Sequence, residues 1–135
     1  MIALDTSALV RYLTDDEPTL AARVAELVDG DEEVGIPALV LLEAVHVLRG
    51  APYRRDNPEL ADALVDLLAR ENVRLVGLDA ELAGAAIRHV RDRSARHLAD
   101  ALISASAAEA GARQLVTTDR RFVADLVPLL QIGDG

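Results

Sequence analysis

Short apolar runs alternate with helical patterns along the chain, and this alternation constrains the fold more than any other feature. Four runs have the length and composition of buried strands: residues 2–4, 34–36, 73–78 and 114–117. Parallel strands need a long crossover connection, which is usually a helix. The pattern therefore predicts a three-layer α/β/α sandwich with a central parallel sheet of four to five strands.

The segments between these runs have the spacing and the boundary residues of helices. The predicted helices cover residues 8–13, 18–28, 37–49, 58–68, 79–92, 98–110 and 120–126. Pro18 and Pro58 stand at helix starts, and Gly30 and Gly111 stand where helices end. An edge strand is expected at 129–132. With 135 residues and no repeat or linker, we expect one domain covering residues 1–135.

The composition excludes several kinds of chemistry. There is no cysteine, which rules out disulfides, zinc–thiolate sites and a thiol nucleophile. All 14 basic residues are arginine, so no lysine is present for catalysis. A net charge of −9 argues against docking of the whole surface onto nucleic acid. It does not exclude chemistry on nucleic acid, because clustered carboxylates can hold metal ions. Without a signal-peptide pattern or a long apolar run, we expect a cytoplasmic protein with no membrane partner.

Asp5 ends the first apolar run and is followed by two hydroxyl residues, Thr6 and Ser7. In an open α/β sheet, ligands bind outside the carboxyl ends of the strands, which is where Asp5 would lie. The alternative is that Asp5 only caps the next helix, although Thr6 or Ser7 is a good cap by itself. We therefore expect Asp5 to belong to a functional site.

Glu43 lies in the middle of a helical segment that is apolar nearly all round. Such a helix is expected to be buried, and an unpaired buried carboxylate is costly. This setting predicts a functional role for Glu43. The alternatives are a salt bridge to an arginine or a position at the rim of the sheet that water reaches.

Two further aspartates are less informative when taken singly. Asp100 is expected in the first turn of a helix, where the dipole favours a carboxylate, among small residues that allow close packing on the sheet. Asp119 follows the fourth apolar run and either belongs to a site or caps the helix predicted to start at Arg120. Thr117 either supports a metal-bound water or holds the local turn.

Together the four carboxylates indicate a metal site. The strands should bring Asp5 and Asp119 to one edge of the sheet, beside the helices that carry Glu43 and Asp100. With no cysteine and no obvious histidine pair, the donors are all oxygen, which suits Mg²⁺ or Mn²⁺. Such an ion lowers the pKa of a bound water and stabilises the leaving oxygen of a phosphodiester.

Four segments resemble the PIN-domain ribonucleases and, in order and spacing, the VapC toxins of bacterial toxin–antitoxin pairs. They are residues 4–7 (Leu-Asp-Thr-Ser), 42–45 (Leu-Glu-Ala-Val), 99–103 (Ala-Asp-Ala-Leu-Ile) and 117–119 (Thr-Thr-Asp). The resemblance covers the whole chain. It implies a PIN-like fold with an acidic catalytic site, a metal bound by part of that site, and polar support nearby. The implied catalytic residues are Asp5, Glu43, Asp100 and Asp119, the metal ligands are Asp5, Asp100 and Glu43, and the supporting residues are Thr6, Ser7 and Thr117.

The resemblance also implies an activity and partners that no pattern of residues shows. It implies an endoribonuclease that acts on RNA, forms a homodimer and is held by a small antitoxin whose tail lies over the site. Because a cluster of carboxylates attracts a cation with directional donors, we expect that tail to place an arginine against Asp5 and Asp100.

Two other functions remain open from the sequence. A receiver-type signalling domain also has acidic residues after its first strand and an aspartate after its third, here Asp79. Its chemistry requires a lysine near the site, and this chain has no lysine. A catalytically inactive PIN fold that serves as a binding module is the second alternative.

The remaining polar candidates are weaker. His46 and His97 stand near Glu43 and Asp100, although an exposed or satisfied histidine is the commoner case, as we expect for His89. Two arginine groups either steer RNA phosphates or are solvated; they are Arg88, Arg91, Arg93 and Arg96, and Arg54 with Arg55. The acidic run at 15–17 is expected to be a solvated turn at a helix start, with a metal role for Asp15 or Asp16 as the minority alternative.

Overall fold

A five-stranded parallel sheet forms the centre of the molecule, as the sequence predicts. The computed structural model describes residues 1–14, 16–123 and 126–133. The strands are β1 (Ile2–Leu4), β2 (Val34–Pro37), β3 (Val73–Val76), β4 (Gln114–Thr117) and β5 (Leu129–Gln131). Each lies within two residues of its predicted bounds. β1 and β2 are buried along their whole length, whereas the edge strands β3 and β5 are partly exposed.

The order of the strands places a switch point between β1 and β4. The order is β3-β2-β1-β4-β5, so the chain builds the sheet outward from β1 in one direction and then returns to its other side. β1 and β4 are hydrogen-bonded neighbours, with Leu4 opposite Val116. In open α/β sheets the crevice outside the carboxyl ends of such a strand pair is where ligands bind.

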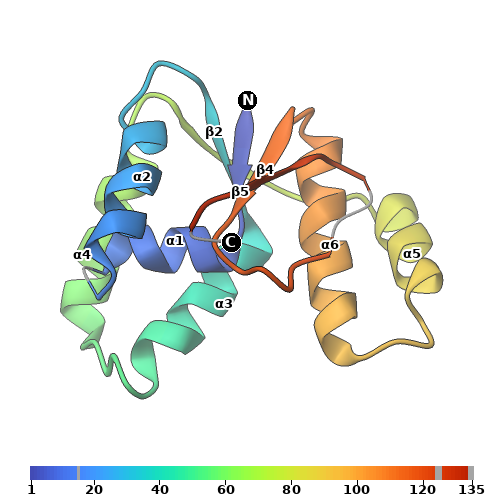
Figure 1. Ribbon diagram of the computed structural model, residues 1–135, viewed down its shortest axis with the longest axis horizontal. Helices are drawn as coiled ribbons and strands as arrows, with labels where there is room; N and C mark the ends of the chain where they lie inside the picture. Colours follow the sequence, from blue (N-terminus) through green and yellow to red (C-terminus); the bar gives the residue numbers. More distant parts are fainter. Residues whose placement is uncertain (15, 124–125, 134–135) are drawn as a thin grey trace.

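Six helices cover the two faces of the sheet in the described part of the chain. They are α1 (Thr6–Leu13), α2 (Pro18–Val28), α3 (Ala38–Arg49), α4 (Asn57–Leu68), α5 (Ala80–His89) and α6 (Ala95–Glu109). Helices α1 to α4 lie together on one side, and α5 packs against α6 on the other (Figure 1). Right-handed crossovers explain the division, since the steps from β1 to β3 move one way and the step to β4 moves back.

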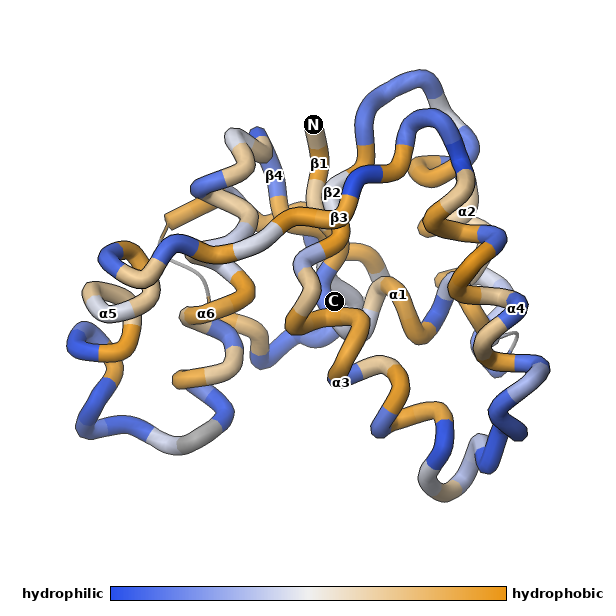
Figure 2. The backbone as a smooth tube through the Cα atoms, turned by 180° about the vertical axis from the view of Figure 1, so that it is seen from behind, coloured by the Kyte–Doolittle hydropathy of each residue, from blue (hydrophilic) through white to orange (hydrophobic). Residues whose placement is uncertain are grey.

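The core is built from aliphatic residues of the strands and of the helix faces that meet them. Ile2, Leu4 and Leu115 of the sheet are fully buried, as are Leu9 of α1 and Leu48 of α3. In Figure 2 the loops that join the helices are largely hydrophilic, whereas the central strands are mostly hydrophobic. No helix in the described ranges is long and apolar enough to cross a membrane.

The helix predicted for residues 120–126 is wrong within the described residues. Residues 120 and 121 form a turn, 122 and 123 are irregular, and residues 124 and 125 lie outside the described ranges. Asp119 therefore caps no helix. The side chains of Phe122 and Val127 are both buried, which draws this segment along the core instead of leaving one face of a helix in water.

The prediction for the helix that carries Asp100 is also wrong in one respect. Helix α6 begins at Ala95, after Ser94 as its N-cap, so Asp100 lies in the second turn and not the first. The starting point is earlier because residues 95–97 (Ala-Arg-His) continue the helix, although they lack the large apolar side chains that mark the rest. Gly111 ends this helix as predicted, with a φ of 77° that favours glycine.

Candidate active site

Asp5 is the buried carboxylate at the switch point. It follows β1 directly and is 2% exposed. Its Oδ1 accepts hydrogen bonds from the amide of Ala8 at 2.9 Å and from the hydroxyl of Ser7 at 2.8 Å. Burial raises the pKa of Asp5 from 3.8 to about 6, although hydrogen bonds from Thr117, Ala8 and Ser7 lower it. Helix α1 begins at Thr6, so Asp5 is its N-cap, and Thr6 and Ser7 are not.

The hydroxyls of Ser7 and Thr117 connect the ends of β1 and β4. Ser7 Oγ accepts a hydrogen bond from the amide of Thr118 at 2.9 Å and lies 3.3 Å from Thr117 Oγ1. Thr117 Oγ1 in turn accepts from the amide of Asp119 at 3.0 Å. Both residues therefore lie between Asp5 and Asp119, and their supporting role stays a prediction.

Asp119 is held by the turn that follows β4. Its Oδ1 accepts from the amide of Arg121 at 2.9 Å, and its carbonyl accepts from the amide of Phe122 at 3.1 Å. The charge of Asp119 raises the pKa of both Asp5 and Asp100, after the larger effect of burial on each. The carboxylate thus lies within electrostatic range of the other two aspartates.

Asp100 faces the same region from α6. It is 8% exposed, and its Oδ2 accepts from the amide of Val123 at 3.4 Å. Burial is the main reason that its pKa is raised, while the charges of Asp119 and Glu43 raise it further. Asp5 at the end of β1 and Asp100 on α6 are therefore both buried and both affected by the charge of Asp119.

The sequence predicts a buried Glu43, but in the structure this side chain is only half-buried. Helix α3 exposes Leu42 at 56% and Val47 at 40%, and the Glu43 side chain is half-buried at the rim of the site. Thr6 donates a hydrogen bond from Oγ1 to Oε2 of Glu43 at 3.3 Å. The apolar sequence of α3 predicts burial all round, but part of the α3 surface faces solvent. The cost of a buried carboxylate applies to Asp5 and not to Glu43.

Arg96 is a site residue that the sequence analysis did not assign. Its Nη2 forms an ion pair with Oδ2 of Asp119, and its charge lowers the pKa of Asp100. The signal in the sequence was its spacing, because Arg96 stands four residues before Asp100 and shares that face of a helix. The other arginines of that group are exposed, as are His46 and His89, whereas His97 is half-buried and contacts Ser94.

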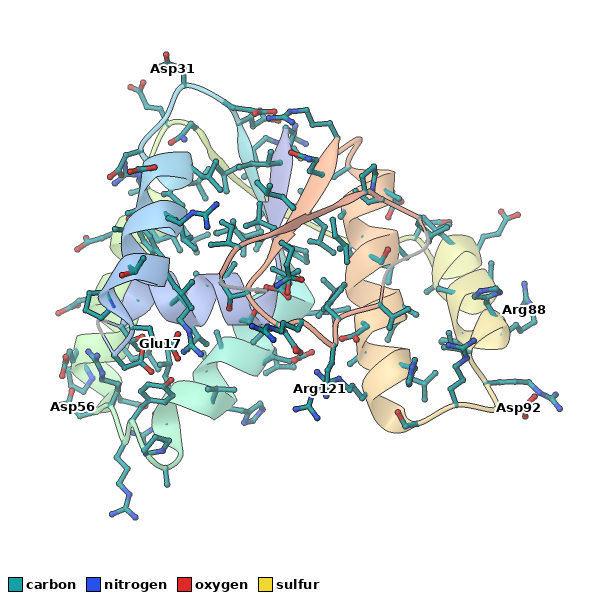
Figure 3. All side chains as sticks on the ribbon, in the orientation of Figure 1. Glu17, Asp31, Asp56, Arg88, Asp92 and Arg121 are labelled. Carbon is teal, nitrogen blue, oxygen red and sulfur yellow. The ribbon has the colours of Figure 1, made fainter. Side chains whose placement is uncertain are left out.

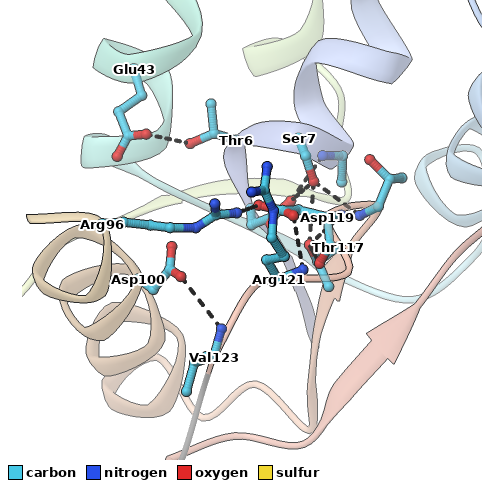
Figure 4. A network of polar contacts seen from close by, with 12 residues as sticks. Thr6, Ser7, Glu43, Arg96, Asp100, Thr117, Asp119, Arg121 and Val123 are labelled. Carbon is cyan, nitrogen blue, oxygen red and sulfur yellow. Dashed lines mark hydrogen bonds and ion pairs between the residues drawn. The ribbon is translucent and has the colours of Figure 1, made fainter. Parts of the chain in front are cut away.

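The four predicted carboxylates face one region of the molecule. In Figure 4, Glu43 lies above Arg96 and Asp100 below it, and the Arg96 side chain extends between them to Asp119. Within the described residues, no three aspartate, glutamate or histidine groups are close enough to hold a metal ion as they stand. The fold therefore gathers the acidic groups, with a guanidinium among them, and shows no completed metal cage.

The donor chemistry of these residues fits Mg²⁺ or Mn²⁺. All the predicted ligands offer carboxylate oxygens, and hydroxyls of Thr6 and Ser7 contact Glu43 and Asp5 respectively. Mg²⁺ commonly takes only one or two carboxylates and keeps several waters, so it needs no cage of three. The raised pKa of Asp5 also suits a nearby cation, which would favour the ionised carboxylate.

Two adjoining clefts beside the site are lined by arginines. One, of about 480 Å³, is lined by Arg11, Arg23 and Arg120 near the start of α2. The other, of about 600 Å³, shares Arg11 and Arg120 with the first and extends to Asp119. Arg11 forms ion pairs with Asp16 and Glu17, so this acidic run is partly neutralised and not simply solvated. Asp15 lies outside the described residues.

A model of the PIN domain matches residues 2–124. The chain belongs to the PIN-domain family. No curated protein matches the sequence. The PIN assignment agrees with the resemblance noted in the four acidic segments.

Solved structures with the same PIN fold include a VapC toxin. VapC20 of Mycobacterium tuberculosis, described as a sarcin–ricin-loop-cleaving toxin, has a TM-score of 0.67 and 21% identity, over 90% of this chain and 92% of that chain. VapBC2 of Rickettsia felis, bound to a promoter DNA fragment, has a TM-score of 0.64 and 17% identity, over 97% and 98%. FitAcB of Neisseria gonorrhoeae has a TM-score of 0.61 and 21% identity, over 96% of each chain. At these identities the likeness concerns the fold.

Proposed function

We propose that this PIN domain is a Mg²⁺- or Mn²⁺-dependent endoribonuclease and the toxin of a toxin–antitoxin pair. The observation that carries the proposal is the gathering of Asp5, Asp100 and Asp119 at the switch point of the sheet, with Glu43 at the rim. Asp5 and Asp100 are buried, and burial raises the pKa of both. Buried acidic groups of this kind are typical of functional sites.

Each residue of the proposed site would have a separate role in binding the metal ion. Asp5 and Asp100 are the proposed principal metal ligands, because they are buried and rigidly placed, and Glu43 is the proposed third. Ser7 fixes the orientation of the Asp5 carboxylate through its hydrogen bond. When bound, the metal ion would supply an activated water and stabilise the leaving oxygen of the RNA phosphodiester. Asp119 contributes negative charge at the edge, and its role as a ligand stays part of the proposal.

RNA approaches a protein of net charge −9, so a local basic path is needed. The two adjoining clefts provide one, because Arg11 and Arg120 line both of them. Arg23 also lines the first, and Arg121 lines the second, which extends to Asp119. We infer that an RNA strand lies along these clefts with its phosphates toward the arginines. The sequence that is cut depends on surface shape and is not encoded in this site.

The receiver-type alternative is disfavoured by the position of Asp79. This residue follows β3, the edge strand, and is separated from the end of β1 by β2. Its exposed carboxylate caps α5 through the amide of Leu82 at 3.1 Å. It is therefore remote from Asp5, whereas receiver chemistry needs the acidic groups of both strands together. An inactive PIN fold is left to the experiment below.

The proposed partner is an antitoxin, in addition to a second copy of the chain. One structural neighbour, VapC20, is described as a toxin, and two others, VapBC2 and FitAB, are described as bound to DNA fragments. We propose that the antitoxin of this chain places an arginine against Asp5 and Asp100 and so competes with the metal ion. Replacing every basic residue in the C-terminal segment of the antitoxin should weaken its inhibition of RNA cleavage, most clearly at high Mn²⁺.

The decisive experiment is a nuclease assay on mixed cellular RNA with Mn²⁺ and with EDTA, followed by mapping of the cut ends. We expect discrete cuts with Mn²⁺ and none with EDTA. Asp100→Asn is the matched control for contaminating nuclease, since it changes one oxygen to an amide. If the wild type and Asp100→Asn cut equally, the enzyme assignment is wrong and the inactive PIN fold is favoured.

A further inference from the structure

Arg96 places a positive charge inside the acidic site. It lies in the first turn of α6, and its guanidinium reaches across to Asp119, which follows β4. In Figure 4 the side chain passes between Glu43 and Asp100 on its way to that carboxylate. An ordinary surface arginine extends into solvent, as Arg88 does in the last turn of α5 (Figure 3).

Asp119 is prepared for this contact by the turn around it. Its Oδ1 is engaged by the amide of Arg121, and its own amide is held by Thr117 Oγ1. Oδ2 is the oxygen that pairs with Arg96. The two side chains are 36% and 34% exposed, so the pair is partly shielded from water. A partly shielded ion pair is stronger than one in open solvent.

The pair has a consequence for the other carboxylates. Arg96 lowers the pKa of Asp100, against the charges of Asp119 and Glu43 that raise it. The guanidinium thus offsets the mutual repulsion of the acidic groups.

We propose that Arg96 is an internal counter-ion that occupies the acidic site before the metal binds, and that it competes with the metal for Asp119 and Asp100. The inference rests on the proposed metal-dependent function. The positive charge of a bound divalent cation would replace that of the Arg96 guanidinium. The Arg96–Asp119 pair is therefore broken or weakened when the ion binds. Arg96 therefore lowers the affinity for metal and stabilises the metal-free protein.

The test is to measure Mn²⁺ binding to the whole protein by electron paramagnetic resonance or calorimetry. Arg96→Gln removes the counter-ion, and we expect it to bind Mn²⁺ at least about fivefold more tightly, as expected for loss of a competing ion pair. Arg96→Lys keeps the charge without the planar fork, so its affinity should lie between the two. Arg88→Gln removes the same charge from the outer edge of α5 and should leave the affinity unchanged.

A second measurement, thermal unfolding in EDTA, reports the same contact without metal. Arg96→Gln should lower the unfolding temperature and Arg88→Gln should not. If folded Arg96→Gln binds Mn²⁺ no more tightly than the wild type, the counter-ion proposal is overturned while the nuclease assignment stands. If neither protein binds Mn²⁺, both proposals fail. Tighter binding by Arg88→Gln as well would show only a general effect of charge, and that also overturns the proposal.

Discussion

The carboxylates at the two ends of the central sheet have pKa values that are shifted in opposite directions. At the amino end of β1, Glu32 accepts hydrogen bonds from Arg113 at 2.6 and 2.8 Å. It also forms an ion pair with the terminal amine of Met1 at 3.2 Å. The Arg113 hydrogen bonds lower the pKa of Glu32 to about 2. At the carboxyl end, burial raises the pKa of Asp5 to about 6.

The difference separates a structural acidic group from a candidate functional one. Glu32 lies at the surface with a full complement of cationic partners, so its charge is satisfied within the protein. Asp5 is buried with hydroxyl and amide partners, and the nearest charge that acts on its pKa is Asp119, which opposes ionisation. An added cation would stabilise the ionised form of Asp5, whereas the ionised form of Glu32 is already stabilised by cationic partners.

The largest expected effect is on RNA cleavage. Asp5→Asn and Asp100→Asn should each lower the Mn²⁺-dependent rate by more than about a hundredfold, since even supporting groups of metal sites contribute up to that range. Glu32→Gln, the matching change at the other end of the sheet, should leave the rate unchanged. Rates are measured on a defined RNA fragment. Retained cutting by both aspartate variants would remove the proposed roles.

The second effect is on stability without metal, and it should have opposite signs at the two ends. At pH 7 the fold holds an ionised Asp5 whose pKa is raised from 3.8 to about 6. Asp5→Asn should therefore increase the free energy of unfolding by up to about 3 kcal/mol, at 1.36 kcal/mol per pKa unit. Its amide oxygen can still cap α1. Glu32→Gln should decrease stability instead. Urea denaturation in EDTA checks both, and an Asp5→Asn protein weaker than wild type would contradict the assignment.

The third effect is on pH dependence. The raised pKa of Asp5 adds stability at low pH that is lost as pH rises from 3.8 to about 6. The lowered pKa of Glu32 adds stability above 4.5 that is lost as pH falls toward about 2. Mn²⁺ displaces the proton of Asp5, so its affinity should rise up to about tenfold per pH unit until about pH 6. Calorimetric titrations across pH 5 to 7 test this, and a flat profile would contradict it.

The smallest effect concerns the residues that tie the strands together at each end. Ser7→Ala should weaken Mn²⁺ binding by up to about tenfold, because Asp5 loses the hydroxyl that orients it. Asn72→Ala removes a side chain that bonds the carbonyls of Val28 and Glu32, at 2.8 and 3.2 Å, near the other end. It should lower stability and leave Mn²⁺ affinity unchanged. Equal effects on affinity would mean that Ser7 has a structural role only.

Much of the fold could be predicted from local sequence. The strands were placed within two residues because each is a short apolar run between polar boundaries. The helix at 120–126 was wrong because its residues permit a helix, while the burial of Phe122 and Val127 requires another path. Local preference decided the first case and tertiary packing the second.

The sequence by itself determined which acidic residues follow which strands, and so predicted that Asp5 and Asp119 would meet. It could not determine their environments, because burial and ion pairing depend on which distant elements cover a side chain. Only the tertiary structure showed that Asp5 is buried, that Glu43 lies at a solvated rim, and that Arg96 crosses to Asp119. All three features depend on residues far apart in the chain, and their energies depend on the local exclusion of water.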